Sequence, residues 1–140
     1  MTAEDLVDIE AIKILKSRYF RFMDTKQWDN WAALFTADFY GIYTGDHPDI
    51  EFHGRDDIVS KNREMLAEHP TVHHGHNPEI TLTGKNTAEG VWAMMDYVDI
   101  PGVRFQGYGH YHDEYRKEQG EWRISKIRLS RIRVDTLHHP

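Results

Sequence analysis

The first part of the chain carries hydrophobic residues at the spacing of an α-helix. From Leu6 to Met23 they recur at steps of three and four residues, which predicts an amphipathic helix of about twenty residues. Thr2 is placed to cap the start of this helix. The acids Glu4 and Asp5 follow in its first turn, where the helix dipole favours negative charge. The chain is therefore expected to begin with one long helix that has a single apolar face.

After this helix the pattern predicts short elements and then a change of texture. A second helix is expected around residues 28–35, a strand over Phe39–Tyr43 and a third helix over Arg55–Glu68. From Val72 onward the chain is rich in β-formers that often alternate with polar residues, and turns such as Pro101–Gly102 divide it into strands. The predicted strands are Val72–Thr83, Thr87–Ile100, Phe105–Lys117 and Glu121–Asp135.

This order of elements predicts the fold class. Helices followed by a long antiparallel meander define an α+β fold. A strongly curved sheet wrapped over the N-terminal helices would leave an internal pocket between the two layers, and such cavities often bind apolar molecules. The sequence contains no internal repeat, linker or low-complexity segment, so residues 1–140 are expected to form a single domain.

Composition argues against several classes of protein. The apolar share of 39% and the charged share of 29% are typical of a globular rather than a disordered chain. The formal charge of −6 disfavours a nucleic-acid partner, because phosphates attract a basic surface. The chain has no cysteine for disulfide or thiolate chemistry, and it shows neither a signal peptide nor an apolar run of membrane-spanning length. We therefore expect a cytoplasmic protein with no nucleic-acid or membrane partner.

Three histidines fall within four positions on residues 71–80, TVHHGHNPEI, a segment that otherwise reads as a strand. Imidazole is the side chain whose unperturbed pKa lies nearest physiological pH, so the cluster indicates proton transfer, metal binding or a group of surface rings. Alternation places His73 and Gly75 on one face of the strand, and His74 and His76 on the other. Alternation alone leaves open which face points inward.

Four further side chains break the pattern of their own segments. Tyr19 lies on the apolar face of the first helix, either as a core residue or as a phenol that points into a cavity. Asp24, at the end of that helix, either caps the next helix or takes part in a site. Asp96 lies within the apolar run 92–98, where a carboxylate must be paired, protonated or at an edge. Arg131 continues an apolar row on the last strand, so it is either solvated or paired with an anion.

The segment GYGHYHDEY offers a possible metal site. It places His110 and His112 on one face of a strand, and two such histidines can ligate a metal. Glu114 follows too closely for the usual cupin spacing, and the second histidine motif of cupins is missing. No glycine-rich phosphate loop or nucleophile elbow is present. We therefore predict neither a metal site nor a cofactor.

A series of short motifs spans nearly the whole chain. The motifs are Ile9–Lys13 (IEAIK), Tyr19–Phe20, Asp24, Trp28–Asp29, His73–Thr81 (HHGHNPEIT), Asn86–Ala88, Trp92 to Asp96, Gly120–Ile124 (GEWRI) and Arg131–Ile132. In combination they resemble the SnoaL-like branch of the nuclear transport factor 2-like superfamily, and within it the bile acid 7α-dehydratases, which are related to scytalone dehydratases. The resemblance implies a cone-shaped α+β barrel in which a curved sheet closes on the helices.

The resemblance also implies a set of site residues. In that family the site consists of a helix tyrosine, an aspartate five positions later, a tyrosine on the first strand, a histidine, an aspartate and an arginine. By motif these fall on Tyr19, Asp24, Tyr43, His73, Asp96 and Arg131. The match selects His73 from the histidine cluster and adds Tyr43, which no pattern had marked. Tyr43 and Arg131 would bind substrate, and Phe35 and Trp92 are aromatic candidates for an apolar wall around it.

The activity implied is that of a cofactor-independent lyase. It would eliminate water from a carbonyl-activated hydroxy steroid or a polycyclic, aromatic-like small molecule. His73 would take a proton from carbon, Asp24 would fix the tautomer of His73, and Tyr19 would donate to the developing charge. Asp96 would be a second acid/base or orienting group.

Two alternatives stay open at this point. One is a non-catalytic small-molecule-binding protein or auxiliary subunit that uses the same pocket. The other is an isomerase, similar to ketosteroid isomerases, with Asp96 as the base. Relatives commonly self-associate through the outer face of the sheet, so a homodimer or homotrimer is expected.

Overall fold

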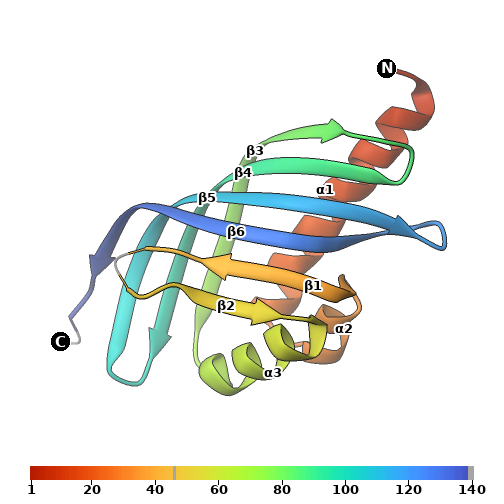
Figure 1. Ribbon diagram of the computed structural model, residues 1–140. Coiled ribbons are helices and arrows are strands. Elements are labelled where there is room, and N and C mark those ends of the chain that lie inside the picture. Colours follow the sequence, from red (N-terminus) through yellow and green to blue (C-terminus); the bar gives the residue numbers. More distant parts are fainter. Residues whose placement is uncertain (46, 139–140) are drawn as a thin grey trace.

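The computed structural model describes residues 1–45 and 47–138, which form three helices packed against one six-stranded sheet (Figure 1). The helices are α1 (Ala3–Asp24), α2 (Trp28–Ala32) and α3 (Arg55–Leu66), and the strands are β1 (Phe35–Tyr43), β2 (Ile50–His53), β3 (Thr71–Leu82), β4 (Thr87–Ile100), β5 (Val103–Glu118) and β6 (Glu121–Thr136). The α+β prediction is confirmed. The sequence analysis missed the short strand β2, and the helix expected around residues 28–35 is shorter because β1 already begins at Phe35.

Side-chain hydrogen bonds mark the start of helix α1, and a left-handed residue follows its end. The Thr2 hydroxyl accepts a hydrogen bond from the backbone N–H of Asp5 (3.0 Å), and the Asp5 carboxylate accepts one from the N–H of Thr2 (2.8 Å). This reciprocal pair is a capping box. At the other end Lys26 adopts a left-handed backbone conformation (φ 59°), which turns the chain away after Asp24. The buried face of α1 consists of Ile12, Leu15, Lys16, Tyr19, Phe20 and Met23.

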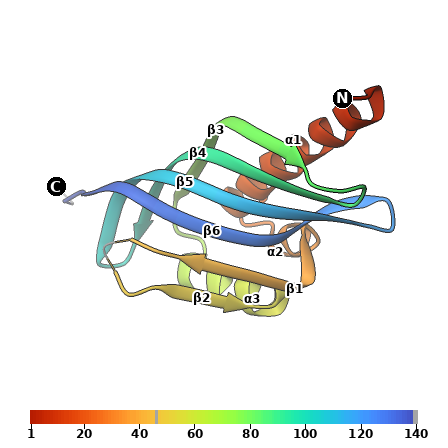
Figure 2. The same cartoon turned by 45° about the horizontal axis from the view of Figure 1, so that its top comes forward.

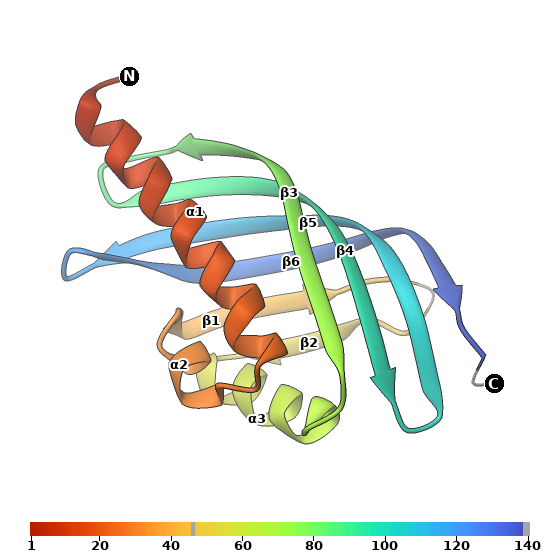
Figure 3. The same cartoon turned by 180° about the vertical axis from the view of Figure 1, so that it is seen from behind.

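The sheet is mixed, curved and open. Its strand order is β2-β1-β6-β5-β4-β3, in which β1 runs parallel to β6 and every other neighbouring pair is antiparallel. The register shifts between His76 and Glu79 on β3, and between Tyr108 and Gly109 on β5, at irregularities of the kind that bend a strand. Figure 2 shows the curvature, and Figure 3 shows α1 lying across the concave face. The strands thus form a cone that is not closed into a complete barrel.

Two glycines allow close approach within this cone. A Cβ at Gly75 of β3 would lie 2.6 Å from the ring of Phe20, so α1 packs directly against this strand. A Cβ at Gly107 of β5 would overlap side-chain atoms of Asp96 and Arg131. A larger residue at either position would displace the elements that position the site described below.

Aromatic rings fill the core where α1 and α2 meet β1. The ring of Phe35 lies 4.8 Å from that of Trp31 and 4.8 Å from that of Phe39, centroid to centroid, both in edge-to-face geometry. Within the described ranges, no helix is long and apolar enough to span a membrane.

Candidate active site

A cavity of about 220 Å³ lies between α1, α3 and the concave face of the sheet. Its hydrophobic lining residues are Met23, Ile50, Met65, Leu66, Val98, Ile100, Phe105 and Leu129. Its polar lining residues are Tyr19, Tyr43, His47, Asn62, His73, Asp96, Tyr111 and Arg131. The fold therefore brings five of the six residues that the family motifs had selected into one largely apolar chamber. The sixth, Asp24, lies outside the lining and is hydrogen-bonded to His73.

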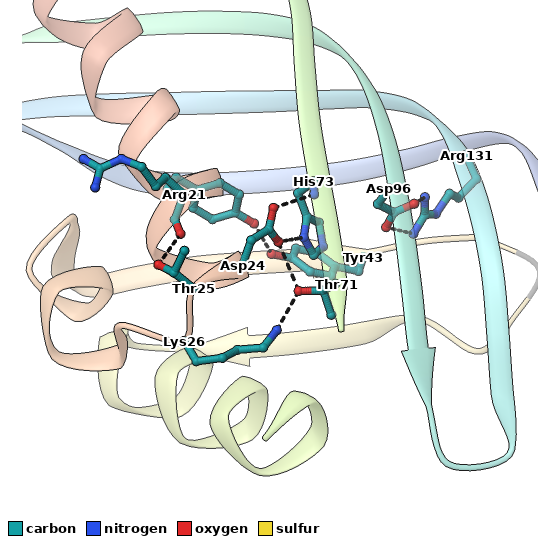
Figure 4. A network of polar contacts seen from close by, with 10 residues as sticks. Arg21, Asp24, Thr25, Lys26, Tyr43, Thr71, His73, Asp96 and Arg131 are labelled. Atoms are coloured by element: carbon teal, nitrogen blue, oxygen red, sulfur yellow. Dashed lines mark hydrogen bonds and ion pairs between the residues drawn. The ribbon is translucent and has the colours of Figure 1, made fainter. Parts of the chain in front are cut away.

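His73 and Asp24 form a hydrogen-bonded pair at the edge of this cavity. His73 Nδ1 lies 2.7 Å from Asp24 Oδ1, and the backbone N–H of His73 donates to Asp24 Oδ2 at 2.8 Å. The Thr71 hydroxyl donates to Asp24 Oδ1 at 3.0 Å, and Lys26 Nζ donates to that hydroxyl at 2.6 Å (Figure 4). The carboxylate is thus held by three donors from β3. Because a carboxylate only accepts, we assign the imidazole proton to Nδ1, which leaves a lone pair on Nε2.

The position of Asp24 resolves one alternative that the sequence had left open. The residue preceding α2 is Gln27, and no side chain caps that helix. Asp24 instead reaches across to β3, because the turn at Lys26 ends α1 beside the first residues of that strand. Asp24 does not line the cavity itself. It lines a separate hollow between α1 and β3, together with His73, His74 and His76.

Three tyrosines, here called the cavity tyrosines, extend the polar side of the chamber. The hydroxyls of Tyr19 and Tyr43 lie 3.1 Å apart and share a hydrogen bond. Burial raises the pKa of both phenols above its ordinary value, so both are neutral donors at physiological pH. Burial likewise raises the pKa of the third, Tyr111, whose hydroxyl has no hydrogen-bond partner among residues 1–45 and 47–138.

Sequence reasoning missed Tyr111. It lies between His110 and His112, whose rings are 6.3 Å apart, in a segment read only for metal ligands. Alternation along β5 puts Tyr111 on the opposite, inward face, and that pattern could have found it. Within the described part of the chain, no group of three or more histidine, aspartate or glutamate side chains could hold a metal ion.

Asp96 and Arg131 form a two-pronged ion pair in the cavity wall. Arg131 Nη1 donates to Asp96 Oδ1 at 2.6 Å, and Nη2 donates to Oδ2 at 2.8 Å. The two side chains are only 5% and 10% exposed. Bidentate pairs of this kind are among the strongest hydrogen-bonded contacts in proteins. Because both carboxylate oxygens are engaged, Asp96 is poorly placed to act as a free base.

The structure corrects two expectations about the cavity wall. Phe35 packs between Trp31 and Phe39 in the core, and Trp92 donates from its indole nitrogen to the hydroxyl of Tyr115 at 2.9 Å. Neither residue lines the cavity, because both lie in the aromatic core outside it. The wall is formed by aliphatic side chains, methionines and Phe105 instead.

Two polar lining residues had not been marked by the sequence. Asn62 of α3 is 4% exposed, and its amide donates to the backbone carbonyl of Ile58 at 2.8 Å. His47 lies in the turn between β1 and β2, where its Nδ1 contacts the carbonyl of Pro48. Their helix and turn carry no motif, so only the tertiary structure reveals that they face the cavity.

Comparison with known proteins places the chain in a family. Residues 4–128 match the family model of the SnoaL-like domain, and the chain therefore belongs to the SnoaL-like family, within the nuclear transport factor 2-like superfamily. Its fold is that of a scytalone dehydratase-like protein of Novosphingobium aromaticivorans, with a TM-score of 0.86 and 22% identity over 100% of this chain and 94% of that one.

Two further relatives share its length. A hexachlorocyclohexane dehydrochlorinase, LinA type 3 of Novosphingobium barchaimii, has a TM-score of 0.79 and 17% identity, covering 95% of this chain and 92% of its own. The probable cyclase FGR4 of Gibberella zeae is 23% identical, over 90% of this chain and 94% of its own. At these identities the solved structures establish the shared fold. The finer resemblance to bile acid 7α-dehydratases stays a prediction.

Proposed function

We propose that this protein is a lyase that eliminates water from a carbonyl-activated hydroxy compound, with His73 as the base. The observation that carries the proposal is the 2.7 Å contact between His73 Nδ1 and Asp24, at the edge of an apolar cavity with three phenols. The relatives named above include proteins described as dehydratase-like, dehydrochlorinase and cyclase, which supports small-molecule chemistry of this type.

The reaction begins with proton transfer from carbon. His73 Nε2 takes a proton from the carbon next to the substrate carbonyl, and the electrons of the C–H bond move toward the carbonyl oxygen. Asp24 keeps the second ring proton on Nδ1 and stabilises the imidazolium that forms. In a largely apolar chamber this interaction is stronger than in water.

The second half of the reaction expels the hydroxyl group. Cavity tyrosines, Tyr19 among them, donate hydrogen bonds to the carbonyl oxygen as negative charge develops there. The enolate electrons then form the carbon–carbon double bond, and the β-hydroxyl leaves as water after receiving the proton from the imidazolium of His73. The products are an α,β-unsaturated carbonyl compound and one water molecule, and His73 returns to its neutral form.

The size of the cavity restricts the substrate. At about 220 Å³ it is smaller than the pockets of roughly 300–1,000 Å³ that bind drug-sized ligands. A molecule of one or two rings suits this volume better than a four-ring steroid. Ile50 and Met65 line the cavity and are partly exposed, at 39% and 45%, so we place its mouth between β2 and α3.

The two alternative functions are less well supported. An isomerase that uses Asp96 as base would first have to free a carboxylate that Arg131 holds at both oxygens. A non-catalytic binding protein has no need of a histidine held to an aspartate by two hydrogen bonds. Dehydration with His73 as the base uses the His73–Asp24 pair and leaves the Asp96–Arg131 pair intact.

The proposal is tested by screening cyclic β-hydroxy ketones for formation of the conjugated enone, followed by its ultraviolet absorbance. His73→Ala should lower kcat by about 100- to 10,000-fold, the usual contribution of a general base. His74→Ala is the matched control, because His74 is the next residue but lies on the outer face of β3. Equal turnover by wild type and His73→Ala would refute the assignment, and so would no turnover by wild type across the panel.

A further inference from the structure

A charged pair lies deep in the core, beside the cavity but not in it. Lys16 of α1 and Asp113 of β5 have fully buried side chains, and Lys16 Nζ lies 2.8 Å from Asp113 Oδ2. Removing two charges from water costs several kcal/mol for each ion, and hydrophobic residues of similar size are often at least as stable in such positions. The pair is therefore poorly explained by stability, and its surroundings indicate another role.

Asp113 is held by a chain of hydrogen bonds from residues that do not line the cavity. Its Oδ2 accepts a hydrogen bond from the hydroxyl of Tyr115 at 2.8 Å, and that hydroxyl accepts one from Trp92 Nε1 at 2.9 Å. Asp113 Oδ1 is buried without a hydrogen-bond partner among the described residues. The carboxylate is thus fixed in place. Burial lowers the pKa of Lys16, and the charge and hydrogen bond of Asp113 oppose that shift and favour the ammonium form.

The ammonium faces the rings of two cavity tyrosines. Lys16 Nζ lies 4.1 Å from the ring centroid of Tyr19 and 3.9 Å from that of Tyr111, both within cation–π range. Within residues 1–45 and 47–138, Nζ also contacts Asp113 in the ion pair and the ring of Phe20, whose centroid lies 5.4 Å away. Tyr19 and Tyr111 both line the cavity. The positive end of the ion pair therefore lies directly behind two phenols that form the cavity wall.

We propose that Lys16 is a positioning residue that, held by Asp113, strengthens the hydrogen bonds donated by Tyr19 and Tyr111 to a negatively charged oxygen in the cavity. A phenol that donates to an anion gains electron density in its ring, and a cation over the ring face stabilises that density. This offsets the burial that otherwise makes ionisation of these phenols unfavourable. The inference rests on the proposed function, in which the anion is the enolate, and it names the ligand class as enolates and phenolates.

The test uses 4-nitrophenol, whose absorbance distinguishes its ionised from its neutral form when bound. Lys16→Gln combined with Asp113→Asn removes both charges and keeps two amides able to bond to each other. We expect the ionised fraction of bound 4-nitrophenol to correspond to a bound pKa about one higher than in wild type, the size of one desolvated cation–π contact. Affinity for 4-nitrotoluene, a neutral molecule of similar shape, should change by less than about twofold, because a cation–π effect acts on the anion.

A control separates this effect from the loss of any buried charge. Asp8 of α1 and Lys117 of β5 form a partly buried pair at 3.1 Å, away from the cavity lining. Asp8→Asn with Lys117→Gln should leave the ionisation of bound 4-nitrophenol unchanged. If Lys16→Gln with Asp113→Asn does not fold, Lys16→Met with Asp113→Asn tests the same point.

The outcomes separate this inference from the proposed function. Equal ionised fractions in wild type and in the charge-free variant would overturn the role of Lys16 and leave the dehydratase proposal standing. A parallel loss of affinity for both probes would mean a purely structural role, which also overturns it. If 4-nitrophenol neither binds nor ionises on wild type, the oxyanion site itself fails, and the proposed function fails with it.

Discussion

Replacing Asp24 by asparagine tests the central pair of the site with little change in shape. The carboxylate accepts from three donors, namely His73 Nδ1, the backbone N–H of His73 and the hydroxyl of Thr71. Asparagine offers one acceptor oxygen where aspartate offers two. If the amide NH2 group faces the backbone N–H of His73, two donors meet without an acceptor. If it faces Nδ1, the imidazole must adopt the other tautomer, with the proton on Nε2. In the second case the lone pair that we assign to the base is lost, and in both cases the negative charge beside the imidazolium is lost.

The magnitude follows from the charge interaction that is lost. At an effective dielectric constant of 20, two unit charges about 4 Å apart interact by about 4 kcal/mol, which is about 1,000-fold in rate. We therefore expect Asp24→Asn to lower kcat for β-hydroxy ketone dehydration by about three orders of magnitude with a smaller effect on KM. The free energy of unfolding should fall by about 1–3 kcal/mol, the cost of one buried donor left without an acceptor.

The assay is enone formation at saturating substrate, with urea denaturation on the same samples. Asp29→Asn is the matched control, because Asp29 is an exposed aspartate in the first turn of α2. The control should keep full activity. If Asp24→Asn retained more than about a tenth of wild-type kcat while remaining folded, the carboxylate would not stabilise an imidazolium, and His73 would not be the base.

Four further outcomes are expected. Tyr19→Phe should lower kcat by about 10- to 100-fold with KM nearly unchanged, measured by steady-state kinetics, because a donor to developing charge acts mainly in the transition state. Arg131→Gln should lower the free energy of unfolding by about 3–5 kcal/mol in urea denaturation, because it leaves the buried carboxylate of Asp96 without its partner. Arg131→Gln combined with Asp96→Asn should lower it by less, because both charges are removed. Gly107→Ala should lower the melting temperature and weaken 4-nitrophenol binding, because a Cβ there overlaps the Asp96–Arg131 pair. Stability in urea should fall as the pH rises above about 10, since the unfolded chain then ionises its tyrosines while the raised pKa of the cavity tyrosines keeps them protonated in the fold.

The sequence predicted the fold well where one pattern governed a long segment. The three- and four-residue spacing of α1 and the alternation of β3 to β6 each extend over at least about a dozen residues. A single residue that departs from the pattern therefore does not hide it. Strand β2, with only four residues, carries too little pattern to be recognised. Alternation correctly separated His73 from His74 and His76, but only the family resemblance indicated which face points inward.

The site was predicted less completely, because contacts across the sheet carry no local signal. Phe35 and Trp92 were expected in the cavity wall, since a large aromatic residue looks the same in sequence whether it borders a cavity or fills the core. Lys16 stands on the apolar face of α1, and its position there was itself an anomaly. Its partner Asp113 lies far along the chain, so no local pattern predicts the ion pair or its place beside the ring of Tyr19.

The Asp96–Arg131 pair shows how a backbone feature can position a functional group that neither residue determines alone. Asp96 lies on β4 and Arg131 on β6, and β5 runs between them. The residue opposite Asp96 on β5 is Gly107, and the arginine reaches the aspartate across this position because no side chain occupies it. The register shift between Tyr108 and Gly109 then brings Gly109 opposite Arg131. Gly107, the shifted register and the ion pair are therefore parts of one arrangement. A change in any of them should move the side chains of Asp96 and Arg131 in the cavity wall.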